Sequence, residues 1–317
     1  MKKEDKELYL ASIKSVDTEE FLDMWFYRPL GFSCALFFRN RGVHPNVITI
    51  MSIFLGVAAG ICFAQESLRW NMFGMLLLIW ANLYDSTDGQ LARMTGQKTR
   101  WGRILDGFAG DCWFFCIYFA ICIRETFDPI PFAPEYNWGL PLWILTSYCG
   151  FWVHGSQCQL ADYYRNIHLY FTNEKNGNEF HNSIAVRKEY DETPWKGYFF
   201  WKIFLSAYVS YVGNQERMTP RFQRLIKTVH DRYGTDIPRG LRDEFRKGSL
   251  PLMKYTNFIT FNSRAIMLCF TMLINQMWMY LFFELIVLMA VFLYMKYKHE
   301  RLCKRLTTEI ENGHEFY

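Results

Sequence analysis

The stretch that decides the fold is DSTDGQLARMTGQKTRWGRILDGFAGD, residues 85–111. At about 100° per helical residue, Asp85 and Asp88 share one helix face at the end of an apolar segment. Asp106 and Asp111 stand at the start of the next apolar segment. Carboxylates at membrane depth are costly, and neighbouring acids resist joint ionisation unless a cation binds them. The pattern therefore predicts a divalent metal site, with Mg²⁺, Mn²⁺ or Ca²⁺ favoured over zinc by the all-oxygen ligands.

Small residues and one arginine accompany these acids. Gly89 and Ala92 lie on the acidic face and leave room for a ligand to approach the backbone. Arg93 follows at the water boundary, where a guanidinium group can pair with phosphate. Together they predict a pocket for a metal and a diphosphate. The alternative is that the small residues only allow close helix packing, while the acids face an aqueous vestibule.

Apolar segments surround this motif and predict an all-α integral membrane protein with six transmembrane helices. A helix needs roughly 20 largely apolar residues to cross a bilayer. Six stretches approach this length, at residues 47–64, 71–84 (continuing helically toward 92), 104–123, 138–153, 258–274 and 277–295. The aromatic content of 19% suits the aromatic belts of a membrane protein. A soluble bundle with buried helices is the alternative.

The distribution of positive charge predicts the orientation of these spans. Of 35 Lys and Arg residues, only Arg69 and Arg124 fall in the loops assigned to the non-cytoplasmic side. By the positive-inside rule, both termini and the active site then face the cytoplasm. The net charge of +4 does not indicate a nucleic-acid partner. The nine cysteines form no CxxC pair and are expected to be reduced, buried thiols.

The chain is expected to divide into five segments. An N-terminal cytoplasmic segment carries an interfacial helix over residues 18–40, and a cytoplasmic insertion separates the fourth and fifth spans. The segments are 1–46 (cytoplasmic and interfacial), 47–168 (membrane helices one to four, with the motif), 169–255 (the insertion), 256–296 (membrane helices five and six) and 297–317 (a cytoplasmic tail).

The motif resembles the signature of the CDP-alcohol phosphotransferases, D-x2-D-G-x2-A-R-x8-G-x3-D-x3-D. Seven of its fixed positions are matched at the family spacing, by Asp85, Asp88, Gly89, Ala92, Arg93, Gly102 and Asp106. Upstream, residues 44–49 (HPNVIT) resemble the Pro-Asn-x2-Thr stretch that opens the first membrane helix of the family. The resemblance covers about residues 20–165.

This resemblance implies a reaction and its participants. The family moves a substituted phosphate group, such as phosphatidyl, from a CDP-activated donor to an alcohol and releases CMP. The implied cofactor is Mg²⁺ or Mn²⁺, and the implied partners are a CDP-linked lipid donor, a small alcohol acceptor and membrane lipids, with a homodimer also considered. By position, the metal ligands would be Asp85, Asp88, Asp106 and Asp111, and the nucleotide and diphosphate would be bordered by Asn46, Thr49, Gly89, Ala92 and Arg93.

The sequence departs from the signature at its last position, where Gly110 replaces aspartate and Asp111 follows. The resemblance implies that this last carboxylate is a metal ligand and the general base. On a regular helix, Asp111 points about 140° from Asp106, instead of about 40°. One hypothesis is a π-helical bulge between Gly107 and Gly110 that restores the position. The other is that a different residue is the base, and His154 at the end of the fourth span is the best substitute.

The departure also leaves the function open in two directions. A phospholipid headgroup transferase, acting on another lipid such as a ceramide, would keep the fold and give His154 a larger role. A non-catalytic protein that binds lipid or metal is a further alternative, against which the nearly intact motif argues. Inositol, inositol phosphate, glycerol phosphate, choline and serine all stay open as acceptors.

Overall fold

The computed structural model describes residues 3–172, 182–234 and 236–316. Within it the chain forms two compact units. Unit 1 comprises Met1–Gly155 and Phe261–Val287, and unit 2 comprises Ser156–Thr260 and Leu288–Tyr317. The boundaries of these units differ from those of the five predicted segments. Unit 2 begins before the predicted insertion and also includes the C-terminal helix.

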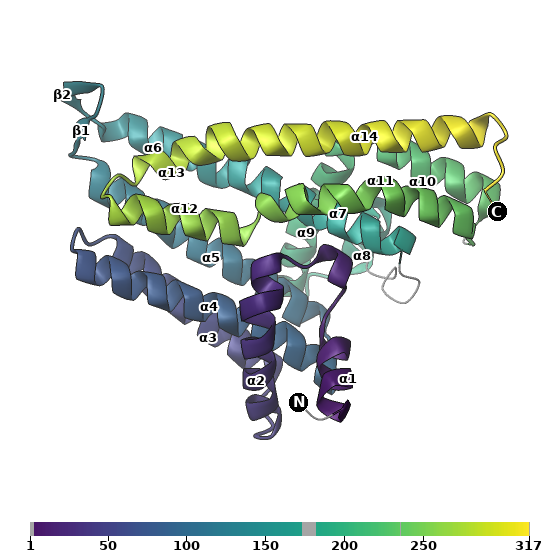
Figure 1. Ribbon diagram of the computed structural model, residues 1–317, viewed down its shortest axis with the longest axis horizontal. Helices are drawn as coiled ribbons and strands as arrows, with labels where there is room; N and C mark the ends of the chain where they lie inside the picture. Colours follow the sequence, from purple (N-terminus) through teal and green to yellow (C-terminus); the bar gives the residue numbers. More distant parts are fainter. Residues whose placement is uncertain (1–2, 173–181, 235, 317) are drawn as a thin grey trace. The chain divides into compact units, whose positions relative to one another are not determined.

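Unit 1 is built almost entirely from helices (Figure 1). Its first half contains α1 (Lys3–Ser12), the 3₁₀ turn η1 (Val16–Thr18), the π-helical turn η2 (Asp23–Tyr27), α2 (Arg28–Arg39), α3 (Pro45–Phe63), α4 (Leu68–Thr95) and α5 (Arg100–Glu125). Its second half contains β1 (Pro129–Ile130), β2 (Ala133–Asn137), α6 (Gly139–Tyr148), the π-helical turn η3 (Cys149–His154), α12 (Phe261–Leu273), α13 (Trp278–Phe282) and the π-helical turn η5 (Phe283–Leu288). The antiparallel pair β1–β2 is an exception to the all-α prediction.

Helix α3 forms the centre of this unit by packing along both α4 and α5. It begins where the side chain of His44 accepts a hydrogen bond from the amide of Asn46, with Pro45 in the first helical position. A Cβ atom at Gly56 would lie 2.0 Å from Trp113 Cδ1, and one at Gly60 would lie 2.5 Å from Cys116 Cβ. These two glycines, four residues apart, therefore allow α3 and α5 to approach closely.

Helix α4 carries the first half of the motif without interruption, as expected, and ends where Gly96 adopts a left-handed conformation. Helix α5 starts at Thr99, whose hydroxyl accepts a hydrogen bond from the amide of Gly102 at 2.9 Å. It is α-helical throughout, so the π-helical bulge expected between Gly107 and Gly110 is absent. The intervening Ala109 is fully buried in the unit 1 core, which fixes the regular register of the helix.

Three helices are long and apolar enough to cross a membrane: Pro45–Phe63, Trp101–Glu125 and Trp278–Glu311. They overlap the first, third and sixth predicted spans, but the last helix continues to Glu311, through most of the segment predicted as a tail. In the described residues the other three predicted spans do not meet the same criterion of length and apolar composition. The prediction of six spans is thus not confirmed.

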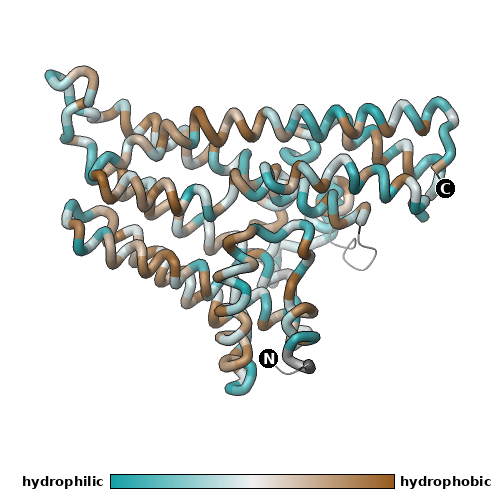
Figure 2. The backbone as a smooth tube through the Cα atoms, viewed as in Figure 1, coloured by the Kyte–Doolittle hydropathy of each residue, from teal (hydrophilic) through white to brown (hydrophobic). Residues whose placement is uncertain are grey.

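Unit 2 contains α7 (Gly155–Thr172), α8 (Ser183–Glu192), α9 (Phe199–Met218), α10 (Pro220–Tyr233), α11 (Arg239–Phe258) and α14 (Met289–Glu311). Helix α8 packs on α9, while α10 and α11 both pack on α14. Hydrophilic residues dominate α10 and α11, whereas α3 and α12 of unit 1 are mainly hydrophobic (Figure 2). Part of the predicted insertion, at 173–181 and 235, lies outside the described residues. All nine cysteines lie within the described part of the chain and form no disulfide there, but only four of them are buried and the other five are half-buried, contrary to the prediction of buried thiols.

Candidate metal and phosphate site

Three of the four predicted acidic ligands meet where α4 and α5 approach each other. One carboxylate oxygen each from Asp85, Asp88 and Asp106 lies within 4.8 Å of the other two. Asp88 is 4% exposed and Asp85 half-buried, whereas Asp106 is exposed, so the group is accessible from the α5 side. Three carboxylates this close repel one another unless a cation offsets their charge. An all-oxygen donor set of this kind fits Mg²⁺ or Mn²⁺.

The N-terminal end of α3 borders these acids. Thr49 is buried, and its hydroxyl donates a hydrogen bond to Asp88 Oδ2. Asn46 lies next to the start of α5, because a Cβ atom at Gly102 would be 3.1 Å from Asn46 Oδ1. The structure thus brings both predicted residues of α3 to the acidic motif, as the resemblance implied.

Arg93 covers the small residue on the acidic face. A Cβ atom at Gly89 would lie 3.4 Å from both Nη1 and Nη2 of Arg93, so the guanidinium group lies directly over this glycine. Arg93 Nε also donates a hydrogen bond to the carbonyl oxygen of Ser12. Ala92 is half-buried beside Arg93 and contributes only its methyl group. A cation thus stands beside the three carboxylates.

A second cation near the acids, Arg28 at the start of α2, is absent from the sequence-based prediction. Arg28 donates to Glu19 Oε2 at 2.9 Å and to Ser86 Oγ at 3.2 Å. It also interacts electrostatically with Asp85 and with Arg93. Burial alone would lower the pKa of Arg28, but Glu19 and the nearby aspartates hold it above its ordinary value. In the sequence, Arg28 could have been noticed as a cation within the otherwise aromatic stretch that was predicted to lie at the membrane interface.

The motif helix holds this N-terminal region in place through Gln90. The side-chain amide nitrogen of Gln90 donates to the carbonyl oxygen of Arg28 at 3.1 Å and to Ser12 Oγ at 3.2 Å. Gly31 lies close to the same side chain, since a Cβ atom there would be 2.6 Å from Gln90 Oε1. The N-terminal helices therefore form one wall of the candidate site.

Asp111 does not belong to the group of three acids. It lies on α5, is exposed, and interacts electrostatically with His154. His154 is 7% exposed and ends the π-helical turn η3, with its ring 4.3 Å from that of Phe114. The two residues predicted as candidate bases therefore interact electrostatically, and on the regular α5 helix Asp111 points away from the direction of Asp106.

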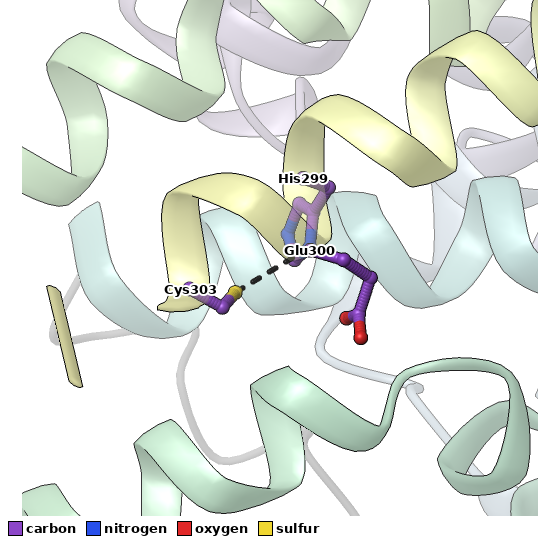
Figure 3. Close-up of side chains that lie close together, drawn as sticks. All are labelled: His299, Glu300 and Cys303. Atoms are coloured by element: carbon purple, nitrogen blue, oxygen red, sulfur yellow. Dashed lines mark hydrogen bonds between the residues drawn. The ribbon is translucent and has the colours of Figure 1, made fainter. Parts of the chain in front are cut away.

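A second group with metal-binding side chains, His299, Glu300 and Cys303, lies on α14 in unit 2 (Figure 3). His299 Nδ1 lies 3.6 Å from Cys303 Sγ, and its ring stacks on Tyr164 at 3.9 Å. Glu300 Oε2 accepts a hydrogen bond from the amide of Arg221 at the start of α10. Ring stacking and helix capping give these side chains structural roles, so we assign no metal to them.

Comparisons with known proteins agree with the motif. Residues 42–155 match the family model of the CDP-alcohol phosphatidyltransferases. An uncharacterized protein of Aquifex aeolicus is 36% identical over 81 residues, which cover 26% of this chain and 40% of that protein. A protein of Streptomyces avermitilis named phosphatidylinositol phosphate synthase is 32% identical over 74 residues, 23% of this chain and 29% of its own length. No solved structure matches the chain.

The matched part of each relative is less than half of its length. The residues that match the family model include the three carboxylates, Thr49 and Arg93. The family is membrane-bound, and the three long apolar helices indicate a membrane protein. Residues 42–155, the part of this chain that is similar to the CDP-alcohol phosphatidyltransferases, therefore contain the whole aspartate motif.

Proposed function

We propose that this protein moves a phosphatidyl or other substituted phosphate group from a CDP-activated lipid to an alcohol acceptor and releases CMP. The observation that carries this proposal is the convergence of Asp85, Asp88 and Asp106 beside Arg28 and Arg93. Carboxylates that hold a divalent cation next to two arginines suit a diphosphate, whose negative charge grows on the leaving group during transfer.

Each residue has a separate role in this proposal. Asp85, Asp88 and Asp106 would hold Mg²⁺ or Mn²⁺, which offsets charge on the diphosphate when bound. Thr49 orients Asp88 through its hydrogen bond. Arg93 and Arg28 would pair with phosphate oxygens, while Asn46 and the small residues of the acidic face would border the nucleotide.

The proton of the acceptor hydroxyl needs a base near the reacting phosphorus. We propose that Asp111 and His154 together supply it, because they interact with each other and lie on neighbouring elements, α5 and η3. A histidine can accept a proton near neutral pH. Asp111 as a metal ligand stays a prediction, since the group of three acids forms without it.

A second candidate function is the transfer of a headgroup from a phospholipid to another lipid such as a ceramide. The regular geometry of α5 favours it, because the last position of the family signature is occupied by Gly110 and no bulge replaces its carboxylate. This reaction would use the same fold and would release no CMP.

We further propose that the active site faces the cytoplasm, with the N-terminal helices on the membrane surface. Exposed aromatic residues in this segment support an interfacial position, since Phe21 is 83% and Trp25 is 71% exposed. The sorted positive charges of the sequence support the orientation.

The test is an assay of CMP release by purified protein with CDP-diacylglycerol, Mg²⁺ or Mn²⁺ and a panel of alcohol acceptors. We expect CMP release that depends on one acceptor and on the metal. Release of no CMP, combined with headgroup transfer between two lipids, would instead establish the second function. An Asp191→Asn variant, changed on the exposed face of α8, serves as the matched control.

A further inference from the structure

Unit 1 contains a buried ion pair far from the signature in sequence. Arg264 on α12 and Glu284 on η5 are both fully buried and form a salt bridge. Glu284 also accepts one shared hydrogen bond from the hydroxyl of Tyr118, which lies 2.7 Å and 2.6 Å from its two oxygens, and another from Tyr280 at 2.8 Å. Buried charges in a membrane protein are costly and mark functional sites more often than structural ones. Arg264, Tyr118 and Tyr280 thus hold the carboxylate of Glu284 inside the core.

This carboxylate reaches His154. Glu284 Oε1 lies 3.6 Å from His154 Nδ1, within ion-pair range. His154 belongs to the π-helical turn η3 and Glu284 to the π-helical turn η5. Such turns are rare and frequently occur at functional sites, because the extra residue redirects a side chain. Both members of this contact are therefore presented by irregular turns in otherwise apolar helices.

One face of α5 connects this contact with Asp111. Asp111, Phe114 and Tyr118 are spaced by three and four residues, so they fall within about 60° on the helix. The ring of His154 contacts those of Phe114 at 4.3 Å and Tyr118 at 5.9 Å. The turn η3 lies close to this face because Gly150 lacks a side chain; a Cβ atom there would be 3.1 Å from Tyr118 Cδ2. His154 thus packs on the same face of α5 that carries Asp111, and it also reaches the buried carboxylate.

We infer that Glu284, held by Arg264 and Tyr118, positions His154 as the acceptor of the hydroxyl proton in the transfer reaction. This inference rests on the proposed function. A carboxylate next to Nδ1 favours the tautomer with hydrogen on Nδ1 and leaves the lone pair of Nε2 free to act as a base. Glu284 is then a positioning residue, and Arg264 keeps its carboxylate ionised in the core.

In the proposed step, the phosphorus that carries the lipid is transferred from CMP to the acceptor hydroxyl. The hydroxyl proton moves to Nε2 of His154, while the hydroxyl oxygen forms a bond to the phosphorus that carries the lipid. The bond from that phosphorus to the oxygen of CMP breaks, and its electron pair stays on CMP. The positive imidazolium is stabilised by the carboxylate of Glu284, and it returns its proton to water after release.

The kinetic test compares Glu284→Gln, His154→Gln and the double variant. Glu284→Gln should lower kcat by about 10²-fold and leave the KM of the CDP donor within about twofold, because the base acts mainly in the transition state. The double variant should be no slower than His154→Gln. If the double variant instead lost kcat by the product of the two single losses, the two residues would act independently and the inference would be overturned. Glu244→Gln, at a half-buried glutamate of unit 2 that pairs with Lys247, is the matched control.

Two further measurements test the positioning role of Glu284. Tyr118→Phe retains the ring and removes one hydrogen bond to Glu284, so it should lower kcat in a variant that still folds. In ligand-free protein with ¹⁵N-labelled histidine, the His154 signal, assigned from its loss in His154→Gln, should show hydrogen on Nδ1 and change in Glu284→Gln. If His154 instead carries its hydrogen on Nε2 and its signal is the same in Glu284→Gln, the positioning role is refuted. This spectrum decides even if the wild-type protein releases no CMP, in which case the proposed function alone fails.

Discussion

At the scale of single residues, Asp88 and Asp106 differ in their surroundings although both lie in the same group of acids. Asp88 is buried and bonded to Thr49, while Asp106 is exposed at the start of the next helix. Asp88 therefore has the more fixed geometry. A carboxylate that is oriented before the metal arrives loses less conformational freedom on binding, so changes at Asp88 should be the least tolerated.

Asp88→Asn should reduce CMP release to the background rate, because the amide keeps the shape of the side chain and removes its charge. EDTA should abolish the activity of the wild-type protein, and added Mg²⁺ or Mn²⁺ should restore it. The measurement is CMP release together with bound metal per chain. Wild-type turnover in Asp88→Asn, with Asp191→Asn as control, would contradict the proposed metal site.

Arg28 gives a separate test of the diphosphate pocket. Arg28→Ala should raise the KM of the CDP donor by roughly 10-fold or more, since a charge-assisted hydrogen bond contributes about 1.5–3 kcal/mol. Arg28→Lys keeps the charge and should lose less. Arg39→Ala, at the exposed end of the same helix, is the control. An unchanged KM in Arg28→Ala would assign this arginine to holding Glu19 and Ser86 alone.

At the scale of helices, the sequence predicted the regular elements better than the irregular ones. Helices α3 and α5 coincide with predicted spans because long apolar runs and the caps at His44 and Thr99 are local signals. The π-helical turns were misplaced: glycines at 107 and 110 permit a bulge, but they do not impose one. The observed turn η3 packs against another helix, where Gly150 lies next to Tyr118. Single-sequence patterns do not contain such contacts.

The acidic part of the site could be predicted from the sequence, but its other charged residues could not. Asp85, Asp88 and Asp106 follow from helical spacing and from the resemblance, and the structure brings them together. Arg28 joins the site only through the folding of the N-terminal helices onto Gln90, and Glu284 only through the packing of η5. These contacts are distant in sequence, so they required the fold.

Gly56 tests the packing of α3 against α5. Gly56→Ala should destabilise the protein, by about 1–3 kcal/mol for a side chain forced into a packed core, because its Cβ atom would meet Trp113. Gly213→Ala in α9 meets no atom within 4 Å and should be neutral or slightly stabilising, since alanine favours helices. Thermal unfolding in detergent compares the two. Equal melting temperatures would mean that α3 and α5 separate easily at this position.

At the scale of the whole molecule, the two units differ in character. Unit 1 contains the family match, the acidic group and the Arg264–Glu284 pair. Unit 2 consists of helices with many charged residues and carries the described part of the predicted insertion. The prediction of a cytoplasmic insertion rests on this polarity and on the positive-inside rule.

Single cysteines introduced at exposed positions should reveal the orientation of the chain. Lys98→Cys, in the loop between α4 and α5, and Asp191→Cys, in α8, should react with a membrane-impermeant thiol reagent only after the cytoplasmic side is opened. Pro134→Cys, in β2, should react from the other side, because its hairpin follows the opposite end of α5 from Lys98. The parent protein, whose nine cysteines are only partly accessible, gives the background. Labelling of Asp191→Cys and Pro134→Cys from the same side would reject the predicted orientation and leave the acidic group without its expected access to cytoplasmic CDP-linked donors.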